Sequence, residues 1–171
     1  MKKVLIVVDY QVDFVNGALG FDGADSLLPK LEARIAEARA SGEDVIFTFD
    51  THEENYMQTN EGKHLPVPHC IRGTGGHALF GLAPETGDRL IYKPGFGSAE
   101  LFDLLRASDY GRVELCGLVT DICVVSNAML AKTALPEAEI VVDASLCDSF
   151  DKAKHEAALA VMESVQITVK R

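Results

Sequence analysis

The sequence predicts an α/β protein with a three-layer, doubly wound, Rossmann-like fold around a six-stranded parallel sheet. Six short apolar runs alternate with segments of helical periodicity along its 171 residues, and this alternation is typical of a parallel sheet covered by helices. The first run, residues 4–8, is apolar throughout, as in strands that are buried on both faces. The length favours one domain, which we expect to span residues 1–171.

The first half of the chain carries two strands and one helix of this alternation. The strand at residues 4–8 is followed at once by Asp9. Apolar residues at helical spacing predict a helix over 25–40, which a serine–glycine pair ends. A second strand at 44–49 ends at another aspartate, Asp50.

A long polar loop, at about 50–86, separates this half from the rest of the chain. Periodicity is lost there, and four of the five histidines lie in the same segment. Loops of such length are usually functional or disordered, and the histidines favour function. Beyond the loop we expect strand 89–92, helix 99–107, strand 113–118, helix 122–132, strand 139–142, helix 151–163 and strand 165–169.

Charge and composition argue against several classes of partner. The net charge of −10 opposes binding to nucleic acid and to anionic membranes. The apolar run at the start ends at Asp9, too early for a signal peptide, and no other stretch is long enough to span a bilayer. Four cysteines without a CxxC pair suit free thiols in a reducing compartment. We therefore expect a cytoplasmic protein that acts on a small molecule.

The chain is organised around residues 112–127, in which a strand passes directly into a helix. Thr120 and Asp121, both good N-cap types, follow the apolar run and precede the helical one. Cys123 is therefore expected in the first turn of a helix, where free N–H groups and the helix dipole favour a thiolate and can bind an oxyanion. The alternative is a small apolar cysteine packed beneath the helix.

Four chemically useful side chains follow the ends of predicted strands. These are Asp9, Asp50, Lys93 and Cys123, and the carboxyl ends of parallel strands share the edge at which such folds bind ligands. Asp9 can take a proton from a thiol, and Lys93 can stabilise the anion. The alternatives are a turn residue for Asp9 and a solvated surface lysine for Lys93. The glycine-rich loop after Lys93 favours a shaped ligand site.

A second group of side chains has the composition of a metal site. Asp50, His52, Glu61 and His69 lie in or beside the long loop. Carboxylate and imidazole ligands suit zinc, manganese or iron, and the lack of a cysteine argues against a structural zinc site. The alternative is a set of polar loop residues bonded to water.

Together these residues resemble the isochorismatase-like cysteine hydrolases. Asp9 after the first strand, a lysine before a glycine-rich loop and the run Gly117-Leu-Val-Thr-Asp-Ile-Cys123 carry the resemblance, which covers essentially the whole chain. The nicotinamidase branch is matched by Asp50-Thr-His52, Glu61 and Pro68-His69-Cys70-Ile-Arg-Gly-Thr74.

The resemblance implies a role for each of these positions. It implies a catalytic triad of Asp9, Lys93 and Cys123, a cis peptide between Leu118 and Val119, and an oxyanion hole made by the N–H groups of Val119 and Cys123. One divalent metal, zinc before iron or manganese, would be held by Asp50, His52, Glu61 and His69. Phe14, Leu19 and Phe96 would line the ring pocket. We also expect a homo-oligomer, either a dimer or a tetramer.

The activity implied is that of a nicotinamidase. Such an enzyme converts nicotinamide and water to nicotinate and ammonia through a thioester, a step in pyridine nucleotide salvage. Residues 65–68 lack the aromatic side chain that many nicotinamidases place before the metal histidine, which leaves Tyr56, Tyr92 or Phe96 to stack on the ring. The alternatives are a ureido or N-carbamoyl amidohydrolase, an isochorismatase, or a binding protein without catalysis.

Overall fold

The computed structural model describes residues 1–171 and contains the expected six-stranded parallel sheet. Its strands lie in the order β3-β2-β1-β4-β5-β6. From β1 the chain adds β2 and β3 on one side of the sheet, and then β4, β5 and β6 on the other side. Doubly wound folds bind ligands at such a switch in strand order, here at the carboxyl ends of β1 and β4. The strands are β1 (Lys2–Val8), β2 (Asp44–Asp50), β3 (Arg89–Lys93), β4 (Tyr110–Leu118), β5 (Glu139–Asp148) and β6 (Thr168–Lys170).

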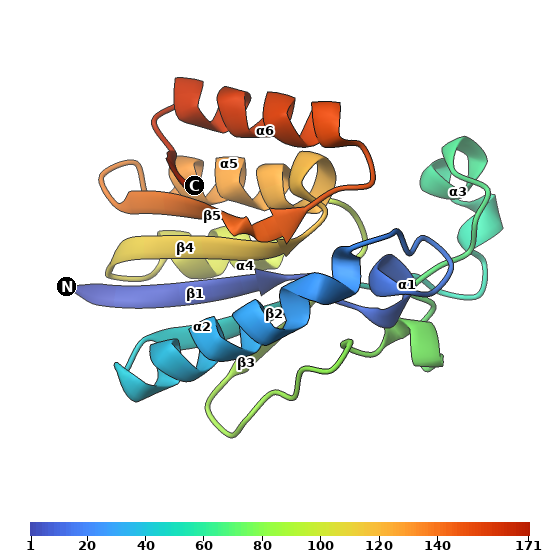
Figure 1. The fold of residues 1–171 in the computed structure, drawn as a ribbon, viewed down its shortest axis with the longest axis horizontal. Helices are drawn as coiled ribbons and strands as arrows, with labels where there is room; N and C mark the ends of the chain where they lie inside the picture. Colours follow the sequence, from blue (N-terminus) through green and yellow to red (C-terminus); the bar gives the residue numbers. More distant parts are fainter.

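Helices cover both faces of the sheet, which confirms the three-layer prediction. Figure 1 shows α2 in front of the strands and α4 and α5 behind them. The longer helices are α2 (Leu28–Ala40), α4 (Ala99–Arg106), α5 (Val125–Ala134) and α6 (Lys152–Ser164). Side-chain caps fix two of their starts, since Ser98 accepts a hydrogen bond from the Leu101 N–H and Asp151 accepts two from the first turn of α6. No helix has the length and apolar character needed to cross a bilayer.

The structure differs from the sequence prediction mainly at the ends of elements. The helix expected over 25–40 begins with a 3₁₀ turn, Ala24–Leu27, before α2. Strand β5 runs six residues beyond the expected 139–142, with an irregularity in its pairing to β4. Strand β6 starts only at Thr168, because the C-terminal turn of α6 still binds Ile167 through the Met162 carbonyl.

The polar loop between β2 and β3 is more regular than its sequence suggested. It contains the short helix α3 (Asn60–His64) and two 3₁₀ turns, Tyr56–Gln58 and Gly75–His77. Together with α1 (Val12–Val15), which the sequence did not predict, α3 lies beyond the carboxyl ends of the strands (Figure 1). The segment 83–87, just before β3, is exposed.

The central strands are buried as a doubly covered sheet requires. Val4 to Val8 of β1 are at most 1% exposed, which confirms the reading of that apolar run. Beside it Gly117 of β4 has a φ of +110°, and a Cβ there would lie 2.1 Å from the Val8 carbonyl oxygen. Only glycine allows the two strands to approach so closely at their carboxyl ends.

Candidate active site

Cys123 lies on a π-helical turn, Thr120–Val124, that joins β4 to α5. The expected side-chain caps at Thr120 and Asp121 are wrong, because Val119 is the N-cap residue, no side chain caps the turn, and the turn continues into α5. The buried Asn127 amide fixes this turn by donating to the Cys123 carbonyl at 2.8 Å.

Asn127 also ties Cys123 to the loop that follows β3. Its Nδ2 donates to the Phe96 carbonyl at 3.0 Å, and its Oδ1 accepts from the Ser98 N–H at 3.0 Å. The sequence prediction missed Asn127. Its only signal was a polar residue one helical turn after the cysteine, on the same face.

Asp9 and Lys93 meet beside this cysteine and are fully buried. Lys93 Nζ lies 2.6 Å from Asp9 Oδ2 and 3.5 Å from Cys123 Sγ. The other carboxylate oxygen, Asp9 Oδ1, accepts from the Thr48 hydroxyl at 2.6 Å. Lys93 is thus not a solvated surface lysine, nor is Asp9 an exposed turn residue. Asp9 also has a φ of +46°, a backbone conformation that few residues other than glycine adopt.

Burial controls the protonation of this group. It raises the pKa of Cys123 well above its usual value, and the nearby Lys93 ammonium opposes that shift. Burial therefore opposes the thiolate that the helix start and the Lys93 ammonium favour. Burial also raises the pKa of Asp9, again against Lys93. The pKa of Lys93 is raised because its anionic neighbours outweigh burial, so the ammonium stays charged.

The backbone at the end of β4 has the geometry that the resemblance implied. The Leu118–Val119 peptide is cis. Val119 and Cys123 both line one cavity of about 490 Å³. The donation of their N–H groups to an oxyanion stays a prediction.

The four predicted metal ligands converge on one point. One donor atom from each of Asp50, His52, Glu61 and His69 lies within 4.8 Å of the other three. Asp50 Oδ2 lies 3.0 Å from Nε2 of His52 and 3.3 Å from Nε2 of His69. Glu61 Oε1 lies 3.6 Å from each of the two imidazole nitrogens. Residues separated by 19 positions in the sequence therefore share one small space.

The chemistry of this donor set fits a divalent cation. His69 Nδ1 lies 2.8 Å from the Val67 carbonyl, and a proton shared there leaves the Nε2 lone pair directed at the cluster. Asp50 Oδ1 lies 3.5 Å from Lys93 Nζ, and its Oδ2 faces the two imidazoles. Contacts with the two imidazoles and the charge of the Lys93 ammonium outweigh burial and lower the pKa of Asp50, which keeps it an anion.

Two polar residues that the sequence prediction missed, the buried Gln11 and the partly buried Asp13, hold these ligands in place. The Gln11 amide donates to the Asp50 carbonyl at 2.9 Å and accepts from the Asp50 N–H at 2.8 Å. Asp13 Oδ2 accepts from the Cys70 N–H at 2.7 Å, next to His69. A Cβ on Gly76 would lie 2.1 Å from the same Asp13 oxygen. The only indication in the sequence of a role for Gln11 and Asp13 was their position two and four residues after Asp9.

The thiol and the metal cluster open into one cavity of about 490 Å³. Phe14, Leu19 and Phe96 line it as the resemblance implied. The lining also includes Ile122 and Phe150, which the sequence prediction did not single out.

Of the three aromatic residues considered for stacking on a ring, only Phe96 lines this cavity. Tyr56 packs edge-on against the rings of His52 and His69, at centroid distances of 4.7 and 5.1 Å. Tyr92 stacks on His77, at 5.9 Å, outside the cavity. Tyr56 therefore supports the histidines rather than a ligand.

Comparison with known proteins agrees with this architecture. A family model described as the isochorismatase domain matches residues 3–170. A Bacillus subtilis isochorismatase family protein named PncA is 29% identical over 94% of this chain and 93% of its own. The ureidoacrylate amidohydrolase RutB of Azorhizobium caulinodans is 29% identical over 74% of this chain and 68% of its own.

Two solved structures share the fold over the full chain. Pyrazinamidase of Pyrococcus horikoshii in complex with zinc has a TM-score of 0.88 and 27% identity, covering 100% of this chain and 99% of its own. The nicotinamidase/pyrazinamidase of Bacillus subtilis has a TM-score of 0.88 and 28% identity, covering 100% of both chains.

Proposed function

The chain belongs to the isochorismatase family, and from that premise we propose that it is a cysteine-dependent amidohydrolase, with nicotinamide or a related neutral amide as substrate. One observation carries the proposal. Asp9 and Lys93 form a buried ion pair whose Nζ lies 3.5 Å from the sulfur of Cys123. Cys123 and three of the four cluster residues, Asp50, Glu61 and His69, line the same cavity. The zinc-bound pyrazinamidase and the nicotinamidase/pyrazinamidase among its structural relatives support this choice.

Acylation begins with a proton transfer. Asp9 takes the proton of the Cys123 thiol. The raised pKa of its carboxyl suits a base that must keep this proton until the amide nitrogen departs. The thiolate, stabilised by the Lys93 ammonium, attacks the carboxamide carbon. The backbone N–H groups of Val119 and Cys123 bind the resulting oxyanion, and a donor of this kind is worth about 2.7–4 kcal/mol.

Collapse of the tetrahedral species completes the first half of the reaction. The C–N bond breaks, Asp9 returns its proton to the departing nitrogen, and ammonia leaves a thioester on Cys123. Asp9, again a carboxylate, then takes a proton from the attacking water. The thioester C–S bond breaks, the acid is released, and the thiol is restored with that proton.

Asp50, His52, Glu61 and His69 would hold one divalent metal. Two imidazoles and two carboxylates suit zinc, and iron or manganese would also be accepted. When bound, the metal supplies a Lewis-acid site that binds a ring nitrogen of the substrate. Nucleophilic attack and proton transfer are carried out by Cys123, Asp9 and Lys93, because a sulfur nucleophile needs no metal-bound water.

The charge of the cavity favours a neutral amide over the acids that related enzymes hydrolyse. Its thirteen lining residues include Asp50 and Glu61 but no lysine or arginine. A ureido acid, an N-carbamoyl amino acid or isochorismate carries at least one carboxylate, which would find no lysine or arginine to pair with among these residues. A binding protein without catalysis is disfavoured as well, because burying Asp9 and Lys93 costs desolvation that a passive site does not need.

Ammonia release tests the proposal. The zinc-loaded protein is assayed with nicotinamide, pyrazinamide, ureidoacrylate and N-carbamoylsarcosine, with Cys123→Ala as the control. We expect turnover of the two ring amides, none in the control, and at least tenfold lower kcat/KM for the two acids. Preference for an acid would assign the chain to a ureido or carbamoyl hydrolase, and no turnover at all would remove the enzymatic proposal.

A further inference from the structure

The side chains that line the cavity are buried at its floor and exposed at its mouth. At the floor, Cys123 is 4% exposed and His69 is 2% exposed. At the mouth, Leu65 is 37%, Phe96 49% and Phe150 59% exposed, although all three line the same cavity. Large apolar side chains so exposed lose the benefit of burial unless something covers them.

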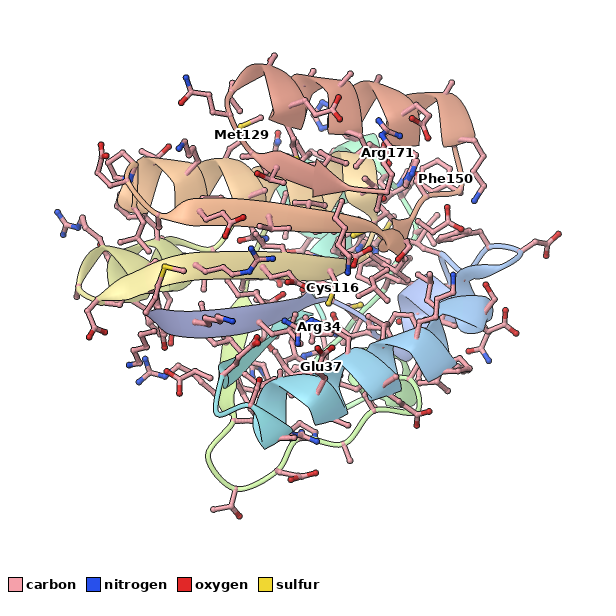
Figure 2. The ribbon with its side chains drawn as sticks, turned by 60° about the vertical axis from the view of Figure 1, so that its left-hand side comes forward. Arg34, Glu37, Cys116, Met129, Phe150 and Arg171 are labelled. Atoms are coloured by element: carbon pink, nitrogen blue, oxygen red, sulfur yellow. The ribbon has the colours of Figure 1, made fainter.

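Phe150 is held at the mouth by ordered structure on both sides. It follows Ser149, which is fully buried, and precedes Asp151, the N-cap of α6. Its ring packs edge-on against Phe21 at a centroid distance of 6.3 Å. Figure 2 labels it at the carboxyl end of the strands, where the chain leaves β5 for α6. Its exposure is therefore not that of a free loop end.

The other two mouth residues are fixed too, and they come from different parts of the fold. The Phe96 carbonyl accepts from the Asn127 amide at 3.0 Å, which holds the turn after β3. The Leu65 carbonyl accepts from the Tyr56 hydroxyl at 2.8 Å, which holds the end of α3. Three apolar side chains on anchored backbone thus surround the entrance.

The cavity is larger than a single ring with one carboxamide requires. Its volume of about 490 Å³ lies in the range of roughly 300–1,000 Å³ that holds drug-sized ligands. The carboxamide carbon must reach Cys123 at the floor, so any further part of a substrate extends towards the mouth. Among the charged residues nearest Phe150 in the sequence, Lys152 contacts Asp148 and Asp151 caps α6, and none of the three lines the cavity.

We propose that Leu65, Phe96 and Phe150 form an outer apolar subsite, and that the preferred substrate is a heteroaromatic carboxamide with an uncharged apolar substituent on its ring. The inference rests on the proposed function, because it takes the carboxamide to lie at Cys123. Burial of apolar groups in such a subsite is worth about fourfold in kcat/KM for each methylene. A phenyl substituent therefore gains on the order of tenfold or more over the bare ring.

The test compares nicotinamide with nicotinamides that carry a phenyl group at each open ring position. Ammonia release gives kcat/KM for the zinc-loaded protein, for Phe150→Ala, and for Phe102→Ala, an aromatic change on α4 outside the cavity. We expect at least one phenyl isomer to exceed nicotinamide by at least tenfold. That ratio should fall in Phe150→Ala, which removes one wall of the subsite, and should be unchanged in Phe102→Ala.

Two outcomes overturn the subsite while leaving the amidase proposal intact. One is hydrolysis of nicotinamide with no phenyl isomer preferred. The other is an unchanged ratio in Phe150→Ala together with a smaller particle in size-exclusion chromatography, which would make Phe150 a contact between copies of this chain.

Binding to Cys123→Ala, measured by calorimetry with the same amides, separates the two proposals. Tighter binding of a phenyl isomer that depends on Phe150, without turnover by the native protein, would support the subsite and remove the amidase. Equal binding of all the amides, or none, would overturn the subsite whatever the activity.

Discussion

Lys93 Nζ and Asp9 Oδ2 lie 2.6 Å apart, and neither side chain has any exposed surface. The ammonium also lies 3.5 Å from Cys123 Sγ, so one cation faces both the carboxylate and the sulfur. A proton that moves from sulfur to carboxylate stays within reach of the same positive charge. The first two predictions depend on this arrangement.

Asp9→Asn should lower kcat by about 10²–10⁴-fold, because the amide neither accepts the thiol proton nor donates one to ammonia. Lys93→Ala should also lower kcat. The double variant should lose far less than the product of the two, since the groups act as a unit. Circular dichroism checks that the variants fold, because loss of Asp9 leaves the buried Lys93 ammonium with Asp50 as its remaining carboxylate partner, at 3.5 Å. Near-normal kcat in Asp9→Asn would move the base to another residue.

Only one of the four cysteines should be needed for turnover. Cys123→Ala should remove activity and the thioester adduct seen by mass spectrometry of quenched reactions. Cys70, Cys116 and Cys147 are buried free thiols as well, and burial raises the pKa of each. Their single serine or alanine variants should keep the chemical step and serve as matched controls. Turnover in Cys123→Ala would end the thiol mechanism.

His52→Ala and His69→Ala should each reduce the metal content of the purified, reconstituted protein well below one ion per chain. Elemental analysis after chelation and reloading gives the occupancy directly, without reference to activity. His64→Ala is the matched control, because that imidazole is exposed and contacts only the Asn60 carbonyl. Full occupancy after removal of both histidines would place the metal elsewhere.

Gln11→Ala should lower both thermal stability and metal affinity. The substitution leaves the Asp50 N–H and two carbonyl oxygens, those of Asp50 and His77, without their buried partner. Each such loss costs about 1–3 kcal/mol. Gln58→Ala, at an exposed site, should change neither the Tm nor the zinc affinity measured by competition with a chelator. Normal zinc affinity in Gln11→Ala would show that Asp50 is positioned without it.

Acid should destabilise the protein partly through Glu114. Burial acts to raise its pKa, but hydrogen bonds and charges from Arg34 and Arg112 outweigh burial and hold it below 4.5. A lowered folded-state pKa contributes stability that is present above the unfolded value and is lost as pH falls through the folded one. Glu114→Gln should therefore lower the Tm at neutral pH and make the fall in Tm below pH 4.5 shallower. Glu137→Gln, at an exposed site, should leave the curve unchanged.

The sequence predicted the sheet because its signals are local. The apolar run of β1 and the alternation of strands and helices follow from short-range periodicity, and both are seen in the structure. Contacts between residues far apart in the chain leave no periodic pattern in the sequence. Gln11 and Asp13 look like loop residues until β2 and residue 70 are folded against them.

The protonation state of Cys123 could not be predicted from the sequence either, because it too depends on long-range contacts. Its place near a helix start favours a thiolate, but how deeply the sulfur is buried depends on the whole fold. Phe150 likewise joins the cavity only because the β5–α6 connection lies beside α1 and the loop after β3.

The exposed segment 83–87 divides the chain so that Asp9 and the four metal ligands precede it, while Lys93 and Cys123 follow it. A backbone cut there gives two fragments, neither of which contains the full set of reactive groups. The fragments would have to rejoin along the β2–β3 and β1–β4 pairings before the Lys93–Asp9 contact could form. Fused to two interacting proteins, the halves make a split reporter whose signal, ammonia release, depends on their reassembly.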